Sequence, residues 1–437
     1  MTQPTPERDR RLLRGIIPPI ADHELAAVMG AFWLFFCVMG GYFAVRPIRE
    51  TVGTLLGRPR VADLFVITWI ASLAIVPLYG FIVARLRRSV FLPWTYGAVA
   101  VALVLVGLGL RGDQLNIAVG QFFYVFISVL NLFLISMFWS FLLELFDSGQ
   151  AKRLFGVIAA GGTAGALVGP FLTDLTVTHI GNSGVLFVGA GMFAMAIVAQ
   201  RTLLRIWHHR SGPDALRNER PIGGNPFAGF MLVLRSPYLL GIALFVVLLA
   251  TVNTFLYFEQ LRLVEAAISE PTERTRLFAR LDWIVQLLTI VSQLLLTAQI
   301  AARFGVTALL IIVPLAMVLG FFALAATGTL AVLIVVFVLR RASEYAFVRP
   351  GREMLYSPLD TETKYKAKNV NDVPVYRGAD AVAAQVSNGL TAAGFSAAMI
   401  ALLGALVSAF WVGVGWWLGR RFEQQAAGNT DGVLRAE

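Results

Sequence analysis

The chain has 437 residues, of which 57% are hydrophobic and 14% are charged, and its formal net charge is +10. Soluble domains carry about a quarter of charged residues, so the composition excludes an ordinary soluble protein. The apolar runs are continuous, which excludes a β-barrel of short alternating strands. Roughly twelve runs reach the ~20 residues that a helix needs to cross a bilayer. We expect an all-α integral membrane protein with about twelve transmembrane helices.

The expected spans follow one another in two groups of six. Lys and Arg gather in alternate loops, which places both termini in the cytoplasm by the positive-inside rule. The basic start runs directly into the first span without a small-residue cleavage pattern, so we expect no cleaved signal. The spans are Leu25–Val45, Val61–Ala84, Val90–Leu110, Ile117–Leu145, Leu154–Val177, Val185–Ile206, Tyr238–Phe258, Trp283–Ala302, Val306–Ala326 and Thr329–Val348, with two more between Lys366 and Leu418.

A polar, Gly- and Pro-rich connection, Trp207–Asn225, separates the two groups. It predicts an amino-terminal bundle over 1–206, a cytoplasmic linker over 207–236 and a carboxy-terminal bundle over 237–437. Short pairings, such as Asp147 with Asp360, recur along the chain at a nearly constant separation, which we call the repeat offset. Collinear pairings at one offset indicate a duplicated half, and two pseudo-symmetric six-helix bundles are the architecture of major-facilitator transporters.

Several function classes find no support in the sequence. Cys37 is the single cysteine, so neither a disulfide nor a thiolate metal cluster can form within the chain. The four histidines are scattered, and there is no phosphate-binding Gly-rich loop with Lys and Ser or Thr. The basic residues lie largely in loops. We therefore predict no catalytic residues, no metal, no cofactor and no nucleic-acid partner.

The fifth span carries Gly161, Gly165 and Gly169 at every fourth position. This spacing places three positions without a side chain on one helical face, which favours close helix packing. The stretch Gly165–Pro170 also resembles the Gly- and Pro-rich fifth-helix motif of drug–proton antiporters. This resemblance makes a proton-coupled exporter an alternative function.

Charges inside apolar spans point to a binding site. An ionisable side chain near the centre of a span costs about 2.5–3.5 kcal/mol on insertion scales, so it usually faces a cavity or a partner. Arg340, Arg341 and Glu344 of the tenth span lie about halfway between Thr329 and Arg352. They have the i,i+3 and i,i+4 spacings of helical ion pairs. Two arginines against one glutamate favour an anionic ligand, although a structural ion pair would also explain the pattern.

The repeat offset predicts that the eleventh span begins near Ala367, so the polar segment after Pro358 should be helical. Its polar residues fall on one face of a regular helix, with Arg377 beside them. Pro374 should kink this helix and free backbone groups. A cytoplasmic loop with accidental spacing remains the alternative. The residues of the face are Tyr365, Asn369, Asp372, Tyr376 and Asp380.

Two motifs in opposite halves resemble the ATP/ADP antiporter family, the nucleotide exchangers of plastids and intracellular bacteria. Pro350–Asp360, followed by Thr361–Lys364, resembles the end of the tenth helix of that family. Phe138–Glu144, followed by Ala151–Gly156, resembles its fourth and fifth helices. The resemblance covers nearly the whole chain and implies nucleotide exchange across a membrane by alternating access.

The resemblance also implies functional charges at four positions, Arg49, Glu144, Glu259 and Arg352. The two basic positions are usually Lys in the nucleotide exchangers, and Arg preserves the charge but changes the donor geometry. After Asp372 the sequence departs from those exchangers and resembles the branch found in free-living bacteria. The substrate of that branch need not be ATP.

We therefore predict a monomeric antiporter of the bacterial inner membrane, whose partners are the lipid bilayer and a small anion, a nucleotide or another phosphorylated metabolite. Arginines would attract the anion, and carboxylates would hold those arginines when the site is empty. A proton-coupled exporter and a non-transporting receptor or assembly factor are the alternatives. The predicted site residues are Arg49, Glu144, Glu259, Arg341, Glu344, Arg352, Tyr376, Arg377 and Asp380.

Overall fold

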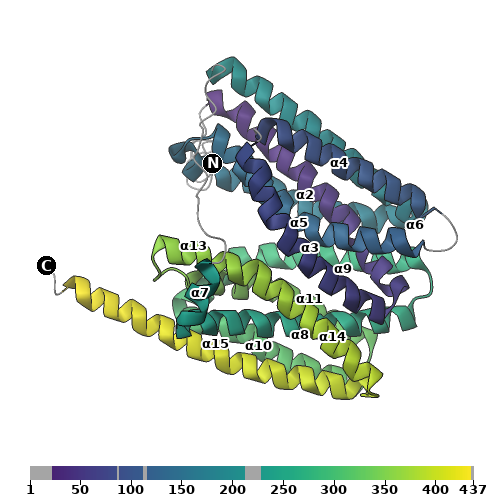
Figure 1. Ribbon diagram of the computed structural model, residues 1–437, viewed down its shortest axis with the longest axis vertical. Helices are drawn as coiled ribbons and strands as arrows, with labels where there is room; N and C mark the ends of the chain where they lie inside the picture. Colours follow the sequence, from purple (N-terminus) through teal and green to yellow (C-terminus); the bar gives the residue numbers. More distant parts are fainter. Residues whose placement is uncertain (1–21, 86–87, 112–115, 212–227, 435–437) are drawn as a thin grey trace, which may run out of the picture. The chain divides into compact units, whose positions relative to one another are not determined.

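A computed structural model describes residues 22–85, 88–111, 116–211 and 228–434, and within these ranges the chain is helical without a strand (Figure 1). Three short π-helical turns interrupt the α-helices: η1 (Gln293–Thr297), η2 (Glu344–Val348) and η3 (Asn371–Val375). The α-helices are α2 (Asp22–Leu56), α3 (Arg58–Arg85), α4 (Arg88–Gly109), α5 (Ile117–Leu145), α6 (Ser148–Ser211), α7 (Ala228–Arg235), α8 (Pro237–Ala267), α9 (Pro271–Ser292), α10 (Ala298–Thr327), α11 (Leu330–Ser343), α12 (Arg349–Met354), α13 (Thr361–Val370), α14 (Tyr376–Ala392) and α15 (Ala397–Leu434).

The described helices supply twelve segments long enough to cross a bilayer. Seven helical stretches among the described residues are long and apolar enough by length and composition. Two of the seven contain a glycine with a non-helical backbone, Gly181 (φ 70°) and Gly305 (φ 72°), and each therefore holds two segments. The helix α3 and the interrupted helices α11–η2–α12 and α13–η3–α14 add three more. The prediction of an all-α protein with about twelve spans is confirmed.

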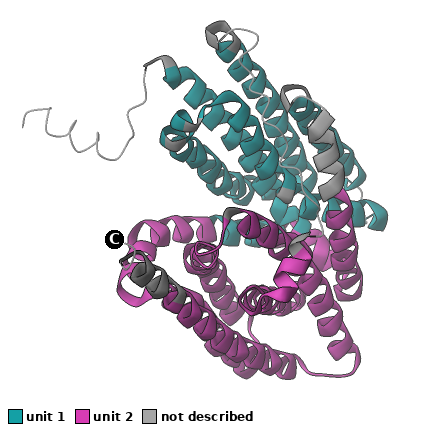
Figure 2. Cartoon of the chain, turned by 60° about the vertical axis from the view of Figure 1, so that its left-hand side comes forward, with its two compact units in different colours: residues 1–49, 79–221, 275–283 teal, residues 50–78, 222–274, 284–437 magenta. Residues whose placement is uncertain are grey.

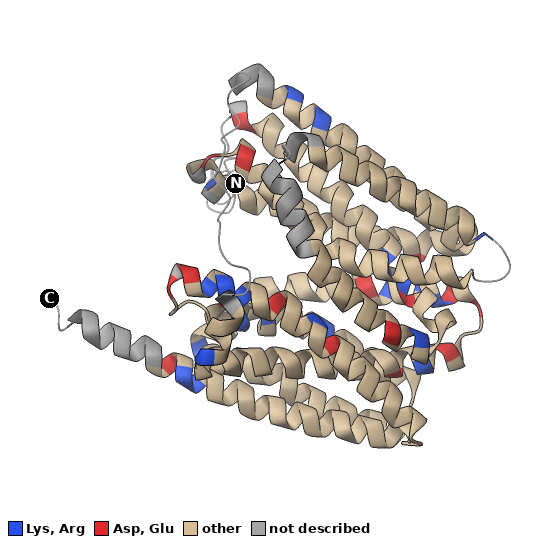
Figure 3. Ribbon diagram, viewed as in Figure 1, with Lys and Arg blue, Asp and Glu red and all other residues tan. Residues whose placement is uncertain are grey.

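Charged residues are sparse along the long helices. Figure 3 shows extended lengths of helix without a charged turn, with the coloured turns gathered at helix ends and at a few positions along the helices. This distribution is expected in a bilayer, where every backbone polar group must be satisfied within the helix and a lipid-facing charge is costly.

Helix boundaries repeat along the chain at the repeat offset, the separation of Asp147 and Asp360. The helices α5 and α11 begin at Ile117 and Leu330, and α6 and α13 begin at Ser148 and Thr361, and both pairs have this same separation. The left-handed Gly181 recurs as Gly394 (φ 86°), again at the repeat offset. These backbone positions agree with the duplicated half that the sequence indicates.

The paired residues Asp147 and Asp360 have the same role in the two copies. The Oδ1 atom of Asp147 accepts the backbone N–H groups of Gly149 and Gln150, each at 2.8 Å. The Oδ1 atom of Asp360 accepts the N–H of Thr363 at 3.0 Å. Both aspartates therefore satisfy donors that a helix start leaves open.

The Asp360 cap makes a pH-dependent contribution to stability. The hydrogen bond from Thr363 holds the pKa of Asp360 below its ordinary value of 3.8. A carboxyl whose pKa is lower in the folded state stabilises the fold above its unfolded-state pKa, and the contribution is lost as the pH falls through the folded-state value. We expect Asp360→Ala to lower the unfolding temperature at about pH 7 and to lower it less at about pH 3. Thermal unfolding at both pH values measures this, with the cap-preserving Asp360→Asn as control; equal losses at both would contradict it.

The π-helical turns occur only in the second copy of the repeat, among the residues that the structure describes. The positions one repeat offset before η1, η2 and η3 are 80–84, 131–135 and 158–162, and all three ranges are plain α-helix. A π turn acts as one extra residue in a helix and is frequent at functional sites. The second copy therefore has a local irregularity that the first copy lacks.

The chain forms two compact units, each made of separate segments (Figure 2). Unit 1 comprises Met1–Arg49, Tyr79–Pro221 and Thr275–Trp283; unit 2 comprises Glu50–Leu78, Ile222–Arg274 and Ile284–Glu437. The boundaries 1–206, 207–236 and 237–437 divide the chain by its repeat instead and stay a prediction. Residues 212–227 of the expected linker lie outside the described residues.

Within unit 1, the glycine face of α6 packs directly on the backbone of α2. A Cβ atom added to Gly161 would lie 2.3 Å from the carbonyl oxygen of Phe32, and one added to Gly165 would lie 2.4 Å from that of Phe36. The Thr173 hydroxyl donates to the Ala44 carbonyl oxygen at 2.8 Å, one turn beyond Gly169. Backbone-to-backbone packing accounts for the every-fourth-residue spacing.

Candidate functional site

Most of the predicted site residues lie in unit 2, and the structure groups them in two polar clusters. The first, called the Glu344 layer, consists of Asn253 and Thr254 of α8, Arg340 of α11, Glu344 of η2, and Tyr376, Arg377 and Asp380 of α14. The second, called the Arg352 layer, consists of Arg352 and Glu353 of α12, Tyr356, Lys368 of α13, and Asn371 and Asp372 of η3.

The Glu344 layer holds two ion pairs within its helices. The Arg340 Nη1 atom lies 2.7 Å from the Glu344 Oε2 atom, at the i,i+4 spacing that the sequence predicts. The Arg377 Nη1 atom lies 3.7 Å from the Asp380 Oδ2 atom, one turn apart on α14. Arg340 exposes only 4% of its surface and Asp380 also 4%. Charges buried to this degree require partners, because an unpaired buried charge is expensive.

Two polar side chains of α8 complete the Glu344 layer. The Thr254 hydroxyl donates to the Asp380 Oδ1 atom at 2.9 Å, and the Asn253 Nδ2 atom donates to the Tyr376 hydroxyl at 3.2 Å. Asn253 and Thr254 are not among the residues that the sequence singles out, because neutral polar residues are common in apolar helices. Their adjacency in the middle of a continuously apolar span is the signal that could have identified them.

Arg341 lies next to Arg340 and is also buried, with 7% of its surface exposed. Its guanidinium carbon lies 5.3 Å from the centroid of the Phe337 ring, one turn earlier on α11. This distance is within the range of a cation–π contact. Together the two layers and Arg341 contain five basic and four acidic side chains.

The Arg352 layer links α12 to α13 and η3. The Arg352 Nη2 atom lies 3.0 Å from the Asp372 Oδ1 atom, and the Lys368 Nζ atom lies 2.6 Å from the Glu353 Oε2 atom. The Asn371 Nδ2 atom donates to the hydroxyl of the buried Tyr356 at 2.9 Å. Arg352 exposes 8% of its surface and the Asp372 side chain 30%, so the ion pair is partly shielded from solvent.

The same two chain segments contribute to both layers, and each passes from one layer to the other through a π turn. In α11–η2–α12 the turn η2 begins at Glu344 and precedes Arg352, and in α13–η3–α14 the turn η3 contains Asp372 and precedes Tyr376. The predicted kink at Pro374 falls within η3. The predicted polar face assumed a regular helix; η3 changes its phase, and Tyr365 is 59% exposed whereas Asp380 is buried.

Unit 1 holds two of the predicted site residues. Arg49, near the end of α2, donates from Nη2 to the Tyr124 hydroxyl at 3.2 Å, and its guanidinium carbon lies 4.6 Å from the Tyr124 ring centroid. Glu144 lies in the last turn of α5 and is half-buried.

Comparison with known proteins identifies relatives of the whole chain. No protein-family model matches it. ADP,ATP carrier protein 1 of Chlamydia muridarum is 25% identical over 458 residues, covering 89% of this chain and 86% of the relative. The protein of the same name from Chlamydia trachomatis serovar D is 23% identical over 457 residues, with the same coverage. The chain is therefore similar over most of its length to ADP,ATP carrier proteins, at 23–25% identity. Its place in the branch from free-living bacteria stays a prediction.

Solved structures agree on the fold. A bacterial homologue of the iron transporter ferroportin, in an inward-facing state, has a TM-score of 0.61 at 14% identity and covers 89% of this chain and 99% of its own. The nucleoside transporter NupG has a TM-score of 0.59 at 14% identity, with 93% and 99% covered. At such identity the likeness concerns the fold alone, which is that of major-facilitator transporters. The carrier relatives and this fold together identify a multi-pass membrane transporter.

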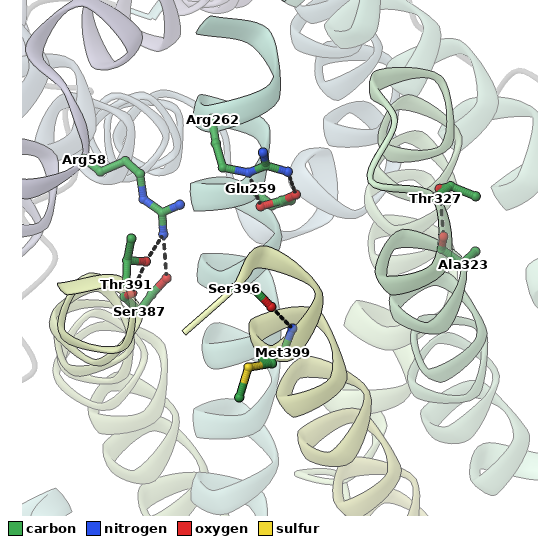
Figure 4. Close-up of polar contacts among 9 residues, drawn as sticks. All are labelled: Arg58, Glu259, Arg262, Ala323, Thr327, Ser387, Thr391, Ser396 and Met399. Carbon is green, nitrogen blue, oxygen red and sulfur yellow. Dashed lines mark hydrogen bonds and ion pairs between the residues drawn. The ribbon is translucent and has the colours of Figure 1, made fainter. Parts of the chain in front are cut away.

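Glu259 is the family-implied charge whose surroundings differ most from the prediction. Its carboxylate forms a two-point ion pair with Arg262 of the same helix, with the Arg262 Nε atom at 3.0 Å (Figure 4). Arg58 of α3 lies nearby, donates to the Ser387 and Thr391 hydroxyls at 3.3 and 3.1 Å, and places its guanidinium carbon 5.5 Å from the Phe258 ring centroid. The carboxylate of Glu259 is thus occupied by Arg262 rather than by an arginine of the two layers.

Unit 1 contains a charged cluster that the sequence analysis did not find. Asp174 of α6 lies 3.4 Å from Arg276 and 3.2 Å from Arg280, and accepts the Trp283 Nε1–H group at 3.0 Å. Beside it, the Arg46 Nη1 atom lies 2.8 Å from the Asp282 Oδ1 atom. Asp174 is a lone acid in an apolar span, and that is the signal by which it could have been recognised. These contacts hold the part of α9 from Thr275 to Trp283 within unit 1.

Removing the Asp174 carboxylate should destabilise unit 1. Hydrogen bonds to charged groups contribute about 1.5–3 kcal/mol, and the half-exposed arginines reduce the ionic part, so we expect Asp174→Ala to cost about 1–3 kcal/mol. Asp174→Asn should cost less, because the amide oxygen can still accept from Trp283. Thermal unfolding in detergent measures both. Asp63→Asn is the control, because Asp63 is exposed and accepts a hydrogen bond from Gln385 at 3.1 Å. An equal loss of stability in Asp63→Asn and Asp174→Asn would argue against a special role for Asp174.

The described residues offer no arrangement for a bound metal. No three His, Cys, Asp or Glu side chains gather in them at metal-binding distances. The arrangement in unit 2 is suited to a different task. Buried arginines paired with carboxylates can exchange those carboxylates for the oxygens of an incoming anion, because guanidinium groups bind carboxylate and phosphate in the same forked geometry.

Proposed function

We propose that this transporter exchanges nucleotides of the ATP/ADP type, or a related phosphorylated metabolite, by alternating access across the bacterial inner membrane. The observation that carries the proposal is the set of arginines in unit 2, of which Arg340, Arg341 and Arg352 expose 4%, 7% and 8% of their surface. Buried arginines are costly and need acceptors, and guanidinium groups bind the oxygens of carboxylates and of phosphates in the same forked geometry. The carrier relatives, matched over most of the chain, support a nucleotide as that ligand.

The proposed mechanism is an exchange of partners. Before the anion binds, Glu344, Asp372 and Asp380 hold Arg340, Arg352 and Arg377. A phosphorylated ligand would take over these guanidinium groups, with Arg341 as a further cation and Tyr376 as a hydroxyl donor. The pair of Arg352 with Asp372 joins separate helices, so a ligand that replaces it favours one arrangement of these helices over another. That differential affinity is the condition for coupling to a conformational change.

The remaining predicted residues lie outside the two layers. Arg49 and Glu144 are the substrate-binding residues that we propose for unit 1, and Glu259 would act through its pair with Arg262. We propose a monomer with both termini in the cytoplasm. The linker and the terminal residues that bear on this orientation lie outside the described residues.

Labelled-nucleotide counterflow tests the proposal directly. Purified protein is reconstituted in liposomes loaded with unlabelled ADP, and uptake of labelled ATP or ADP is followed. We expect uptake that requires internal nucleotide and is reduced by external nucleotide but not by an equal concentration of inorganic phosphate. Folded protein that shows no exchange with either nucleotide would remove the nucleotide version, and the same liposomes loaded with sugar phosphates would then test other phosphorylated substrates.

A second candidate function is proton-coupled export of organic solutes. Asp380 supports it, because its carboxyl is buried and accepts a hydrogen bond from Thr254 at 2.9 Å. A proton-coupled carrier needs such an acid, and Asp380→Asn should abolish transport driven by a pH gradient. Transport that survives this substitution, or that depends on nucleotide in the opposite compartment, would exclude the exporter.

A further inference from the structure

Two of the three π turns are joined by side-chain hydrogen bonds. The Gln293 Nε2 atom of η1 donates to the carbonyl oxygen of Tyr345 at 3.1 Å, and the Thr297 hydroxyl of η1 donates to that of Ala346 at 2.9 Å. Both acceptors belong to η2. The Thr297 hydroxyl also lies 3.3 Å from the Ser292 carbonyl oxygen, but it has one hydrogen, and the shorter contact identifies Ala346 as the acceptor.

Pro350 explains why these two carbonyl groups need donors from outside their helix. Ala346 lies four residues before Pro350, which has no N–H group to donate. Tyr345 lies four residues before Arg349 and five before Pro350, and the Arg349 N–H is bonded to Glu344 instead. The proline and the π turn therefore free two successive carbonyl oxygens, and η1 supplies one side-chain donor to each.

These hydrogen bonds lie beside an exposed apolar surface, where an unsatisfied carbonyl group would be costly. The residues between the two donors, Leu294, Leu295 and Leu296, are 78%, 58% and 45% exposed, as expected for a lipid-facing surface. A backbone carbonyl without a donor is costly in such a medium, because no water is available to replace the lost bond. The Gln293 amide has the same need for a partner.

The proline and its two donors occur together in the repeat. At the repeat offset, Pro350 corresponds to Met137, Gln293 to Gly80 and Thr297 to Ala84. The first copy thus has neither the proline nor a polar side chain at the donor positions, and its helix α5 is continuous. Pro350, Gln293 and Thr297 therefore form one structural unit, the proline break with its two donors, and this unit is specific to the second copy.

The proline break with its two donors lies between the two polar layers. It determines the angle about the helix axis between the side chains of one layer and those of the other. Glu344 begins η2, and Arg352 follows it by eight residues. In a plain α-helix, side chains eight residues apart point about 80° apart around the helix axis. A π turn absorbs one residue, so the rotation is smaller by roughly 100°, and the two side chains point about 20° apart. Relaxation of η2 to an α-helix would therefore turn Arg352 away from the direction of Glu344.

We infer that Gln293 and Thr297 are positioning residues that hold the Pro350 break in the register in which Glu344 and Arg352 face the same anion. The inference rests on the proposed anion-exchange function. Neither residue contacts the substrate. Each bond favours the aligned arrangement, and the apparent affinity for the anion falls in proportion to the population of that arrangement.

The test compares Thr297→Val and Gln293→Leu, which keep the side-chain size and remove the donor, in labelled-ADP exchange by reconstituted full-length protein. Interhelical hydrogen bonds in membranes have modest average strength, so we expect each variant to raise KM for ADP about threefold with a maximal rate within about a factor of two of wild type. Thr297→Ser, which keeps the hydroxyl, should restore the wild-type KM.

Thr327→Val is the matched control, because the Thr327 hydroxyl donates within its own helix to Ala323 at 2.8 Å (Figure 4). It should leave KM unchanged. A Thr297→Val variant with the KM of the control, or one that loses maximal rate without a change in KM, would overturn the inference. Thermal unfolding of each variant confirms that the compared proteins are folded.

A second readout separates this inference from the proposed function. Cys37 is the single cysteine, so Cys37→Ala gives a cysteine-free background in which Arg352→Cys can be labelled by an anionic thiol reagent. We expect Thr297→Val, and not Thr327→Val, to change the labelling rate at least about threefold, because it releases the rotation of α12. If wild-type protein exchanges no nucleotide, the nucleotide proposal fails, and the labelling rates alone decide the inference. Equal rates in the two variants would overturn it.

Discussion

Replacing Arg352 with alanine should reduce nucleotide exchange by about 30-fold, since truncating one partner of a partly buried charge pair costs about 2 kcal/mol, the lower end of the range for buried pairs. The substitution removes a guanidinium group that the proposed anion would bind and leaves Asp372 without the partner that lies at 3.0 Å. The main effect should be on KM, because the lost contact exists already in the bound ground state. Counterflow of labelled ADP at several concentrations gives KM and the maximal rate.

Two variants in the same segment make this result specific. Arg349→Ala removes an exposed arginine that lies over the Tyr345 ring, and it should leave exchange nearly unchanged. Arg352→Lys keeps the charge that the nucleotide exchangers of the family usually carry as Lys, so it should retain most of the exchange. Equal effects of Arg349→Ala and Arg352→Ala would show that the segment matters through its stability and not through anion binding.

Substituting Gly165 with alanine should prevent normal packing of α6 on α2. The added methyl group would lie 2.4 Å from the Phe36 carbonyl oxygen and 2.8 Å from the Gly40 nitrogen, and both are backbone atoms that cannot move independently. Overpacking typically costs about 1–3 kcal/mol, and contact with backbone on two sides favours the upper end. We expect a lower yield of folded protein and a lower unfolding temperature.

Gly156 provides the control for this substitution. It lies in the same helix, and a Cβ atom added there would meet nothing within 4 Å. Gly156→Ala should be neutral or stabilising by up to about 1 kcal/mol, because alanine favours the helix over glycine. Size-exclusion chromatography and thermal unfolding of the two variants measure the difference. A fully stable Gly165→Ala protein would contradict the close packing of α6 on α2.

The fold follows from the sequence because its determinants are local or periodic. Apolar runs of membrane length predict the spans, and pairings such as Asp147 with Asp360 predict the repeat, whose offset the helix boundaries of the structure reproduce. The i,i+4 pairing of Arg340 with Glu344 was predictable for the same reason, since both residues lie on one helix face. Features that depend only on spacing along one helix are accessible to sequence reasoning.

The rest of the site depends on contacts between distant segments and on irregular helix geometry. Nothing local in the sequence pairs Asp174 with Arg280, or Thr254 with Asp380, across more than a hundred positions of the chain. The predicted polar face from Tyr365 to Asp380 assumed a regular helix throughout, and η3 breaks that periodicity. Proline at 374 signalled an irregularity but not its type, because a kink and a π turn use the same freed carbonyl groups.

The π turns of the described residues all lie in the second copy of the repeat, so the two copies differ in local structure. Two equivalent halves related by an axis along the membrane normal would offer an elongated ligand two opposite orientations of equal free energy. Here η1, η2 and η3 have plain α-helical counterparts among the described residues, so the two copies offer a ligand different surfaces. The nucleotide proposed above carries its charge at one end and its base at the other, so its phosphates would bind the arginines of the second copy.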